Sequence, residues 1–223
     1  MESRADLLAA SFTGPLWAAI AAAGGPRPAT RQHAHYPGAY DPRWLATLPL
    51  PVGADRPPGQ PVALLDGQDE FERHQDGAAL AASYDRHRRS QVYEDIGKGA
   101  DDAWYARTAR HLGRLSASAL QVPCSIFASR PGDESLRAHW DAWYGAIVHV
   151  GGAKVWEIGA SLLDGTGQPA LEVTTRAGDI LLLPKGLPHT VRTPEHPGHS
   201  MHLAFAIDRD SRPETGKREI LPA

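Results

Sequence analysis

The fold is decided by the stretch Arg137-Ala138-His139-Trp140-Asp141, which Gly178-Asp179-Ile180-Leu181-Leu182-Leu183-Pro184-Lys185-Gly186-Leu187-Pro188-His189 completes further along the chain. The first stretch has no helix signal and precedes the strand-like run 146–150. Side chains at positions i and i+2 of a strand point to the same face, so His139 and Asp141 are expected to project together into one cavity. In the second stretch the pattern predicts a turn at Gly178-Asp179, a buried strand over 180–183 and a bend just before His189.

Two histidines and one carboxylate on one face form the ligand set that holds Fe(II) in non-haem oxygenases, where three positions of the octahedron stay open. The spacing therefore predicts a metal site made of His139, Asp141 and His189 in a redox enzyme that uses O2. A chance match is the alternative, because the chain has 11 histidines. The same residues would then be a surface histidine, a turn aspartate and a histidine at a strand end.

Three further features accompany this motif. Ser125–Gly132 precedes it and contains Ser129-Arg130-Pro131-Gly132. Lys154 follows His139 after fifteen residues, within the glycine- and tryptophan-containing stretch 151–159. A last strand-like stretch, 200–205, carries His202. In this order the features resemble the JmjC-type oxygenases of the cupin superfamily, and they are most similar to the ribosomal oxygenases and to the asparaginyl hydroxylase that acts on hypoxia-inducible factor.

The resemblance covers about residues 119–208, whereas residues 1–118 are only loosely similar. It implies a mainly β fold with N-terminal helices, built around a double-stranded β-helix, the cupin or jelly-roll barrel. Residues 1–118 would form an arm and helices that pack on the core, 119–208 the catalytic core and 209–223 a short tail, all in one structural domain.

The resemblance also implies roles for single residues. His139, Asp141 and His189 would be the catalytic iron ligands, with O2 and 2-oxoglutarate as co-substrates. Lys154 would pair with the distal carboxylate of 2-oxoglutarate, because a dicarboxylate in a mostly apolar barrel needs a fixed cation. Ser129 and His202 would line the co-substrate pocket. The alternatives are a strand lysine that reaches solvent, an ordinary turn serine and a core histidine.

Some positions depart from the family pattern. The asparaginyl hydroxylase has an amide where this chain has Gly145 and a threonine where it has Leu136. Only a short tail follows position 205, in place of the long C-terminal extension of the ribosomal oxygenases. Gly151 and Gly152 can introduce a bulge that changes which side chains of the strand face the cavity, and the orientation of Lys154 depends on it.

The substrate is the least defined part of the prediction. Trp143 and Tyr144 directly follow the metal motif and are candidate substrate contacts, with hydrophobic core as the alternative, which we favour for Trp140. Candidate charged residues at the mouth of the cleft are Arg137, Arg192, Asp133 and Glu134. We expect hydroxylation of an amino-acid side chain in a peptide, a protein or an amino-acid-like small molecule. A metal-dependent cupin that does not use 2-oxoglutarate and a catalytically silent cupin binding module are the alternatives. Lys154 discriminates against the first, and the intact triad against the second.

Composition limits the remaining classes. The chain has 223 residues, enough for one domain with a sizeable core. A net charge of −3 gives no electrostatic footprint for nucleic acid, and no apolar run predicts a membrane span. A single cysteine fits a reducing compartment, so we expect a cytoplasmic protein. A homodimer is the oligomeric state that we consider for it. The apolar stretch 16–23 is interpreted as a helix ending at Gly24-Gly25-Pro26, since Glu2 and Asp6 oppose a signal peptide.

Outside the motifs we expect an irregular arm over 26–62, a loop and then a helix over 67–89, a strand over 91–96 and a helix over 101–115. Tyr105, Ala109, Leu112 and Leu115 would share the apolar stripe of that last helix.

Overall fold

The computed structural model describes residues 2–28, 30, 32–65, 71–118, 120–164 and 170–207. The predicted tail over 209–223 lies outside these residues. The helices are α1 (Arg4–Ala22), α2 (Pro42–Leu45), α3 (Gly77–Arg86), α4 (Trp104–Leu115) and α5 (Ser161–Asp164), with a 3-10 turn at Gly53–Asp55. The strands are β1 (Ala34–Tyr36), β2 (Val62–Leu65), β3 (Phe71–His74), β4 (Gln91–Tyr93), β5 (Cys124–Ser129), β6 (Tyr144–Ile158), β7 (Leu171–Arg176), β8 (Ile180–Leu183), β9 (His189–Arg192) and β10 (Ser200–Ile207).

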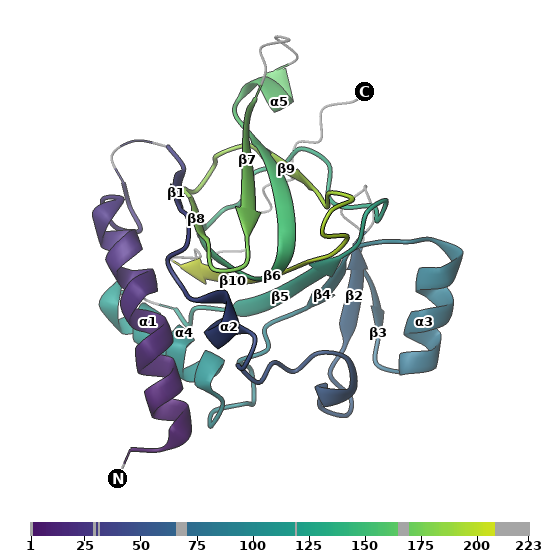
Figure 1. Ribbon diagram of the computed structural model, residues 1–223, viewed down its shortest axis with the longest axis horizontal. Coiled ribbons are helices and arrows are strands. Elements are labelled where there is room, and N and C mark those ends of the chain that lie inside the picture. Colours follow the sequence, from purple (N-terminus) through teal and green to yellow (C-terminus); the bar gives the residue numbers. More distant parts are fainter. Residues whose placement is uncertain are drawn as a thin grey trace.

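The long strand β6 belongs to two sheets. Its first half pairs with β8 and β10, inside the antiparallel order β1-β8-β6-β10-β5-β4-β2-β3. Its second half pairs instead with β7 and β9, which lie over the first sheet in Figure 1. Apolar side chains of both sheets pack against each other, among them Ile147 and Leu181 of the first and Trp156 and Val173 of the second. This arrangement confirms the predicted mainly β fold with N-terminal helices. The described strands do not close into a barrel, since the order ends at β1 and β3.

A β-bulge divides the two halves of β6. Met201 of β10 pairs with Gly151 and His202 pairs with His149, so β6 holds one more residue than its partner at this point. Gly152 has φ +70°, and a Cβ there would lie 2.0 Å from the carbonyl oxygen of His199. Only glycine fits this position, so the sequence marks the bulge.

The bulge decides which side chains of β6 face the space between the sheets. Before it, Gly145 and Ile147 line that space; after it, Lys154 and Trp156 do. The spacing from Ile147 to Lys154 is odd, and regular alternation would place the two side chains on opposite faces. The extra residue in β6 brings Lys154 back to the inner face.

Helices α1 and α4 pack together on the outer side of the first sheet (Figure 1). Phe12 of α1 is fully buried and contacts the rings of Tyr40, Trp104 and Phe205 at centroid distances of 5.1, 4.9 and 6.0 Å. This cluster joins α1 to the arm, to α4 and to β10. By length and composition alone α1 could cross a membrane, yet six of its residues are buried against the core.

Several sequence expectations need correction. Leu115 is 48% exposed rather than part of the apolar stripe, because α4 ends there and Ala117 turns the chain with φ +51°. The 67–89 segment contains β3, which was expected to be loop, and the arm contributes β1. Both are edge strands: β1 pairs with β8, which lies far away in sequence, and β3 pairs with β2, so local patterns do not reveal them.

Candidate metal and co-substrate site

A cavity of about 450 Å³ lies between the two sheets. Its lining comes from strands of both sheets and from the loop that carries the predicted metal motif. The charged and imidazole-bearing residues that line it are Arg73, Glu94, Asp95, His139, Asp141, Lys154, His189 and His202. Predicted ligands and the predicted co-substrate cation therefore share one cavity.

The predicted triad is brought together at this cavity. One ligand atom from each of His139, Asp141 and His189 can be chosen so that all three lie within 4.8 Å of one another. The backbone of His139 donates to the carbonyl of His189 at 3.0 Å, and His189 donates back at 2.8 Å. Gly186 donates to the carbonyl of Asp141 at 2.9 Å. Three backbone hydrogen bonds thus hold together two segments that are distant in sequence.

Backbone carbonyls also set the tautomers of the two histidines. Nδ1 of His139 lies 2.8 Å from the carbonyl of Arg137, and Nδ1 of His189 lies 3.0 Å from that of Leu187. A carbonyl only accepts, so each Nδ1 carries the proton and each Nε2 keeps its lone pair. Oriented Nε2 atoms with one carboxylate are the donor set of a 2-His-1-carboxylate centre, so these residues fit an Fe(II) ion.

Lys154 is buried deep in the same cavity, with 3% of its surface exposed. Its Nζ donates to the hydroxyl of Ser129 at 2.7 Å and to that of Thr193 at 3.3 Å. Burial lowers its pKa from 10.5 to about 8. Among the described residues no carboxylate lies within ion-pair distance of Lys154, so the site is suited to a carboxylate brought by a ligand.

Thr193 was missed by the sequence analysis. It follows His189 by four residues, and this even spacing places both on one face of an extended chain. Ser129 and Thr193 also bond to each other at 2.7 Å, so the two hydroxyls form a prearranged pair around the lysine.

His202 is buried beside this group. Its ring stacks on Phe127 with 5.0 Å between centroids, and the ring of His149 lies 5.9 Å away. Burial, aided by the neighbouring His149 and Lys154, depresses the pKa of His202 well below its usual value. Nδ1 of His202 and Nε2 of His149 are buried without a hydrogen-bond partner among the described residues. His149 was not singled out from the sequence, because its strand reads as ordinary core.

Of the residues predicted to contact substrate, only some line the cavity. Trp143 lines the cavity. Tyr144 is 1% exposed and lies in the hydrophobic core beneath the first sheet, because β6 begins there and alternation turns it away from the face of Gly145. The prediction that Tyr144 contacts substrate does not fit this position. Arg137 is exposed and does not line the cavity, and Arg192 pairs with Glu172 at 3.0 Å.

The two predicted acidic residues are likewise engaged elsewhere. Asp133 pairs with Arg88 at 2.8 Å and Glu134 with His87 at 2.6 Å. The sequence analysis missed the side chains that line the outer part of the cavity, among them Phe71, Arg73, Glu94, Asp95 and Phe127. They come from β3, β4, the turn after β4, and β5, which carry no local motif.

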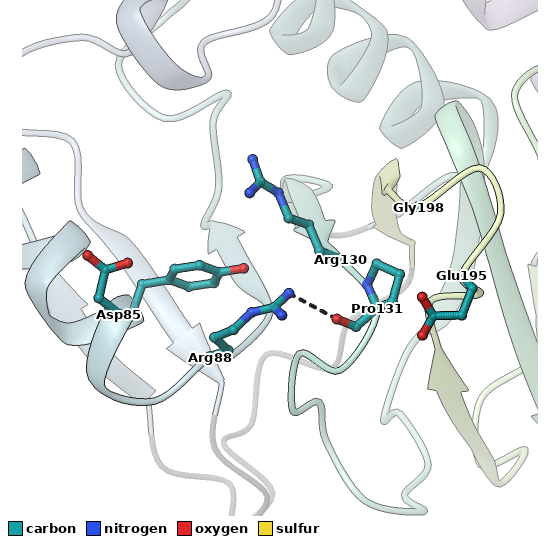
Figure 2. A pocket seen from close by; sticks show the side chains of 7 residues that line it. Asp85, Arg88, Arg130, Pro131, Glu195 and Gly198 are labelled. Carbon is teal, nitrogen blue, oxygen red and sulfur yellow. Dashed lines mark hydrogen bonds between the residues drawn. The ribbon is translucent and has the colours of Figure 1, made fainter.

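A second hollow lies between the end of α3, the loop after β5 and the loop before β10. Arg88, Arg130 and Glu195 line it, and Arg88 donates to the carbonyl of Pro131 at 2.9 Å (Figure 2). It contains neither the triad nor Lys154. The cavity between the sheets is therefore the candidate functional site.

A two-sheet β fold with this triad and a buried lysine defines the class of JmjC/cupin oxygenases, and the model of the JmjC domain matches residues 105–214. The chain therefore carries a JmjC domain. Ribosomal oxygenase 2 of Bos taurus is 24% identical over 145 residues, which are 59% of this chain and 30% of that protein.

Solved structures give the same result for the fold. The structure of YcfD, a ribosomal oxygenase from Escherichia coli, matches with a TM-score of 0.56 and 18% identity, over 79% of this chain and 47% of that one. Its complex with cobalt and 2-oxoglutarate matches with a TM-score of 0.55 and 18% identity, over 79% and 48%. The chain thus spans about a third of the length of the curated relative and about half that of the solved structures.

Proposed function

We propose that this protein is an Fe(II)- and 2-oxoglutarate-dependent oxygenase that hydroxylates an amino-acid side chain in a protein or peptide. The observation that carries the proposal is the buried lysine in the same cavity as the triad. An unpaired ammonium in a largely apolar cavity is costly, and a carboxylate from a bound dicarboxylate offsets that cost. The similarity to ribosomal oxygenases, one of them solved in complex with cobalt and 2-oxoglutarate, supports the same assignment.

Each residue has a defined task in this proposal. His139, Asp141 and His189 would hold the iron, with the Nε2 atoms of the two histidines oriented by the backbone carbonyls of Arg137 and Leu187. When bound, Fe(II) supplies the activation of O2 that couples decarboxylation of 2-oxoglutarate to insertion of oxygen into a C–H bond. Lys154 would fix the distal carboxylate of the co-substrate.

The hydroxyls and His202 complete the co-substrate end. Ser129 and Thr193 would donate to the same carboxylate once it takes the lysine as its partner. His202, held flat against Phe127, would bound the pocket and exclude water. Water exclusion strengthens the charge-assisted bonds of the lysine.

A metal-dependent cupin enzyme that does not use 2-oxoglutarate has no need of a buried cation at this position, so Lys154 disfavours it. The buried free thiol of Cys124 fits a reducing compartment such as the cytoplasm. A homodimer stays a prediction, to be measured by light scattering.

The test is succinate release from 2-oxoglutarate by anaerobically prepared, Fe(II)-loaded protein, with co-substrate binding measured in parallel by calorimetry on Zn(II)-loaded protein. We expect both signals in the wild type and neither in Lys154→Met. Lys98→Met, which changes an exposed lysine, is the matched control and should retain both. A wild type that neither binds 2-oxoglutarate nor releases succinate would contradict the proposal.

A further inference from the structure

Lys154 is an amine buried among neutral partners. It is one of four lysines in the chain, and 3% of its surface is exposed. Its Nζ donates to the hydroxyls of Ser129 and Thr193, at 2.7 and 3.3 Å, and no described carboxylate lies within ion-pair distance of it. An ammonium with neutral partners alone is poorly compensated for its loss of water. This environment favours the uncharged amine.

The uncharged amine is the reactive form of a lysine. Burial lowers the pKa of Lys154 from 10.5 to about 8, so about half of its side chains are uncharged at pH 8. An ordinary exposed lysine, with a pKa of about 10.4, is uncharged in less than about 1% of molecules at that pH. Lys154 therefore presents a free nitrogen lone pair about a hundredfold more often than an exposed lysine.

A small uncharged electrophile can reach this nitrogen. Lys154 lines the cavity of about 450 Å³ between the sheets, together with the apolar side chains of Val92, Ile147 and Val191. The lining includes Arg73, whose side chain is 51% exposed, so the cavity opens to solvent. Ions lose hydration when they enter such a cavity, whereas CO2 is apolar and carries no charge. Among the electrophiles that react with amines in water, CO2 suits these walls.

The groups around Nζ are able to hold an anion as well as a cation. The hydroxyls of Ser129 and Thr193 accept from the ammonium, and each can rotate to donate to an anionic oxygen. His202 lines the same cavity, and its Nδ1 is buried without a hydrogen-bond partner among the described residues. A ring N–H at this atom would be a further donor. These donors distinguish Lys154 from a lysine that is merely buried.

We propose that Lys154 is a reversible carbamylation site that takes up CO2. The lone pair of Nζ forms an N–C bond to the carbon of CO2, and the electron pair of one C–O π bond moves onto its oxygen. The nitrogen releases one proton to solvent, which leaves an uncharged N–H joined to a carboxylate group. Nothing is oxidised or reduced. Dissolved CO2 is sufficient, so the modification does not depend on an oxygenase activity.

The carbamate would exclude the co-substrate, a consequence that rests on the proposed oxygenase function. It replaces the positive charge at Nζ by a negative charge at the place where the distal carboxylate of 2-oxoglutarate is proposed to bind. Two carboxylates would repel each other strongly in a cavity of low dielectric constant. Because decarboxylation of 2-oxoglutarate releases CO2 in the same cavity, the proposed reaction would also supply the inhibitor.

The experiment exposes Zn(II)-loaded protein at pH 8 to bicarbonate labelled with a heavy carbon isotope, and carbon NMR records the carbamate signal. A trialkyloxonium salt then converts the carbamate into a stable ester. Peptide mass spectrometry locates this ester on the chain and separates it from the adduct of the α-amine. The variants are Lys154→Met and Lys154→Arg, which lack the lysine amine. Lys98→Met, at an exposed lysine, is the matched control, and melting temperatures verify that each variant is folded.

The wild type and Lys98→Met should carry the adduct at Lys154, and both Lys154 variants should lack its NMR signal. In the wild type the adduct at Lys154 should be about a hundredfold more populated than the adduct at Lys98. Absence of the adduct from Lys154, or equal population at the two lysines, would overturn the inference.

Saturating 2-oxoglutarate should remove the adduct from the wild type. An adduct that persists while calorimetry shows bound 2-oxoglutarate would refute the exclusion of one by the other. An adduct at Lys154 in a protein that binds no 2-oxoglutarate in CO2-free buffer would contradict the oxygenase proposal and leave the carbamylation site standing.

Discussion

Replacing Lys154 by methionine should make the metal-free protein more stable while removing its affinity for 2-oxoglutarate. Burial holds the pKa of this lysine at about 8 instead of 10.5, which corresponds to about 3 kcal/mol of destabilisation at pH 7. Methionine keeps most of the apolar volume without the charge. Ser129 and Thr193 already bond to each other, so the substitution leaves neither hydroxyl without a partner. We expect the free energy of unfolding to rise by about 1–3 kcal/mol.

The pH dependence follows from the same pKa. Because the folded-state pKa lies below the unfolded-state value, the penalty is complete below pH 8 and shrinks as the pH rises from 8 to 10.5. The stability difference between Lys154→Met and the wild type should shrink over that range. Urea denaturation at pH 7, 8.5 and 10 measures it, and Lys98→Met serves as the control. A variant less stable than the wild type at pH 7, or a difference independent of pH, would refute this reasoning.

Three other outcomes follow from the structure. The affinity of the Zn(II)-loaded protein for 2-oxoglutarate should fall above pH 8, approaching tenfold per pH unit, because Lys154 loses its proton. Calorimetry over pH 7.5–9.5 measures this affinity, and the Lys154→Arg variant should give a flat profile. A flat profile of the wild type would count against this reasoning. Gly152→Ala should lower the free energy of unfolding by more than about 2 kcal/mol in urea denaturation, because the Cβ of alanine would meet the carbonyl oxygen of His199. A smaller loss of stability would mean that the bulge can relax. His139→Ala should weaken Zn(II) binding at least about tenfold in a chelator competition, while His111→Ala, outside the cavity, should not; equal affinities would remove His139 from the ligand set.

The elements that could be predicted from sequence are those whose signals are local. The strand Ile180–Leu183 has the predicted bounds, since four apolar residues stand between a Gly-Asp turn and a proline. The expected pairing of His139 with Asp141 also rests on a local rule, alternation along an extended segment, although the structure forms only an isolated bridge at His139 and no strand over 137–141. What a local rule could not provide is the meeting of His139 with His189, which depends on two backbone hydrogen bonds between separate segments. The motif resemblance supplied that part.

The side chains that line the outer end of the cavity are the hardest to infer from sequence, for a physical reason. A metal demands particular ligand types at nearly fixed distances, so its motif is constrained wherever it occurs. The outer end of the cavity obeys no such constraint, since any combination of side chains that matches the charge and shape of the substrate suffices. Asp95 lines the cavity because the chain turns at a positive φ after β4. Tyr144 points away from the cavity because it directly precedes Gly145 in β6, and neighbouring residues of a strand face opposite sides. Each placement depends on the position of a single residue at the end of a strand, and a pattern averaged over several residues does not resolve a shift of one.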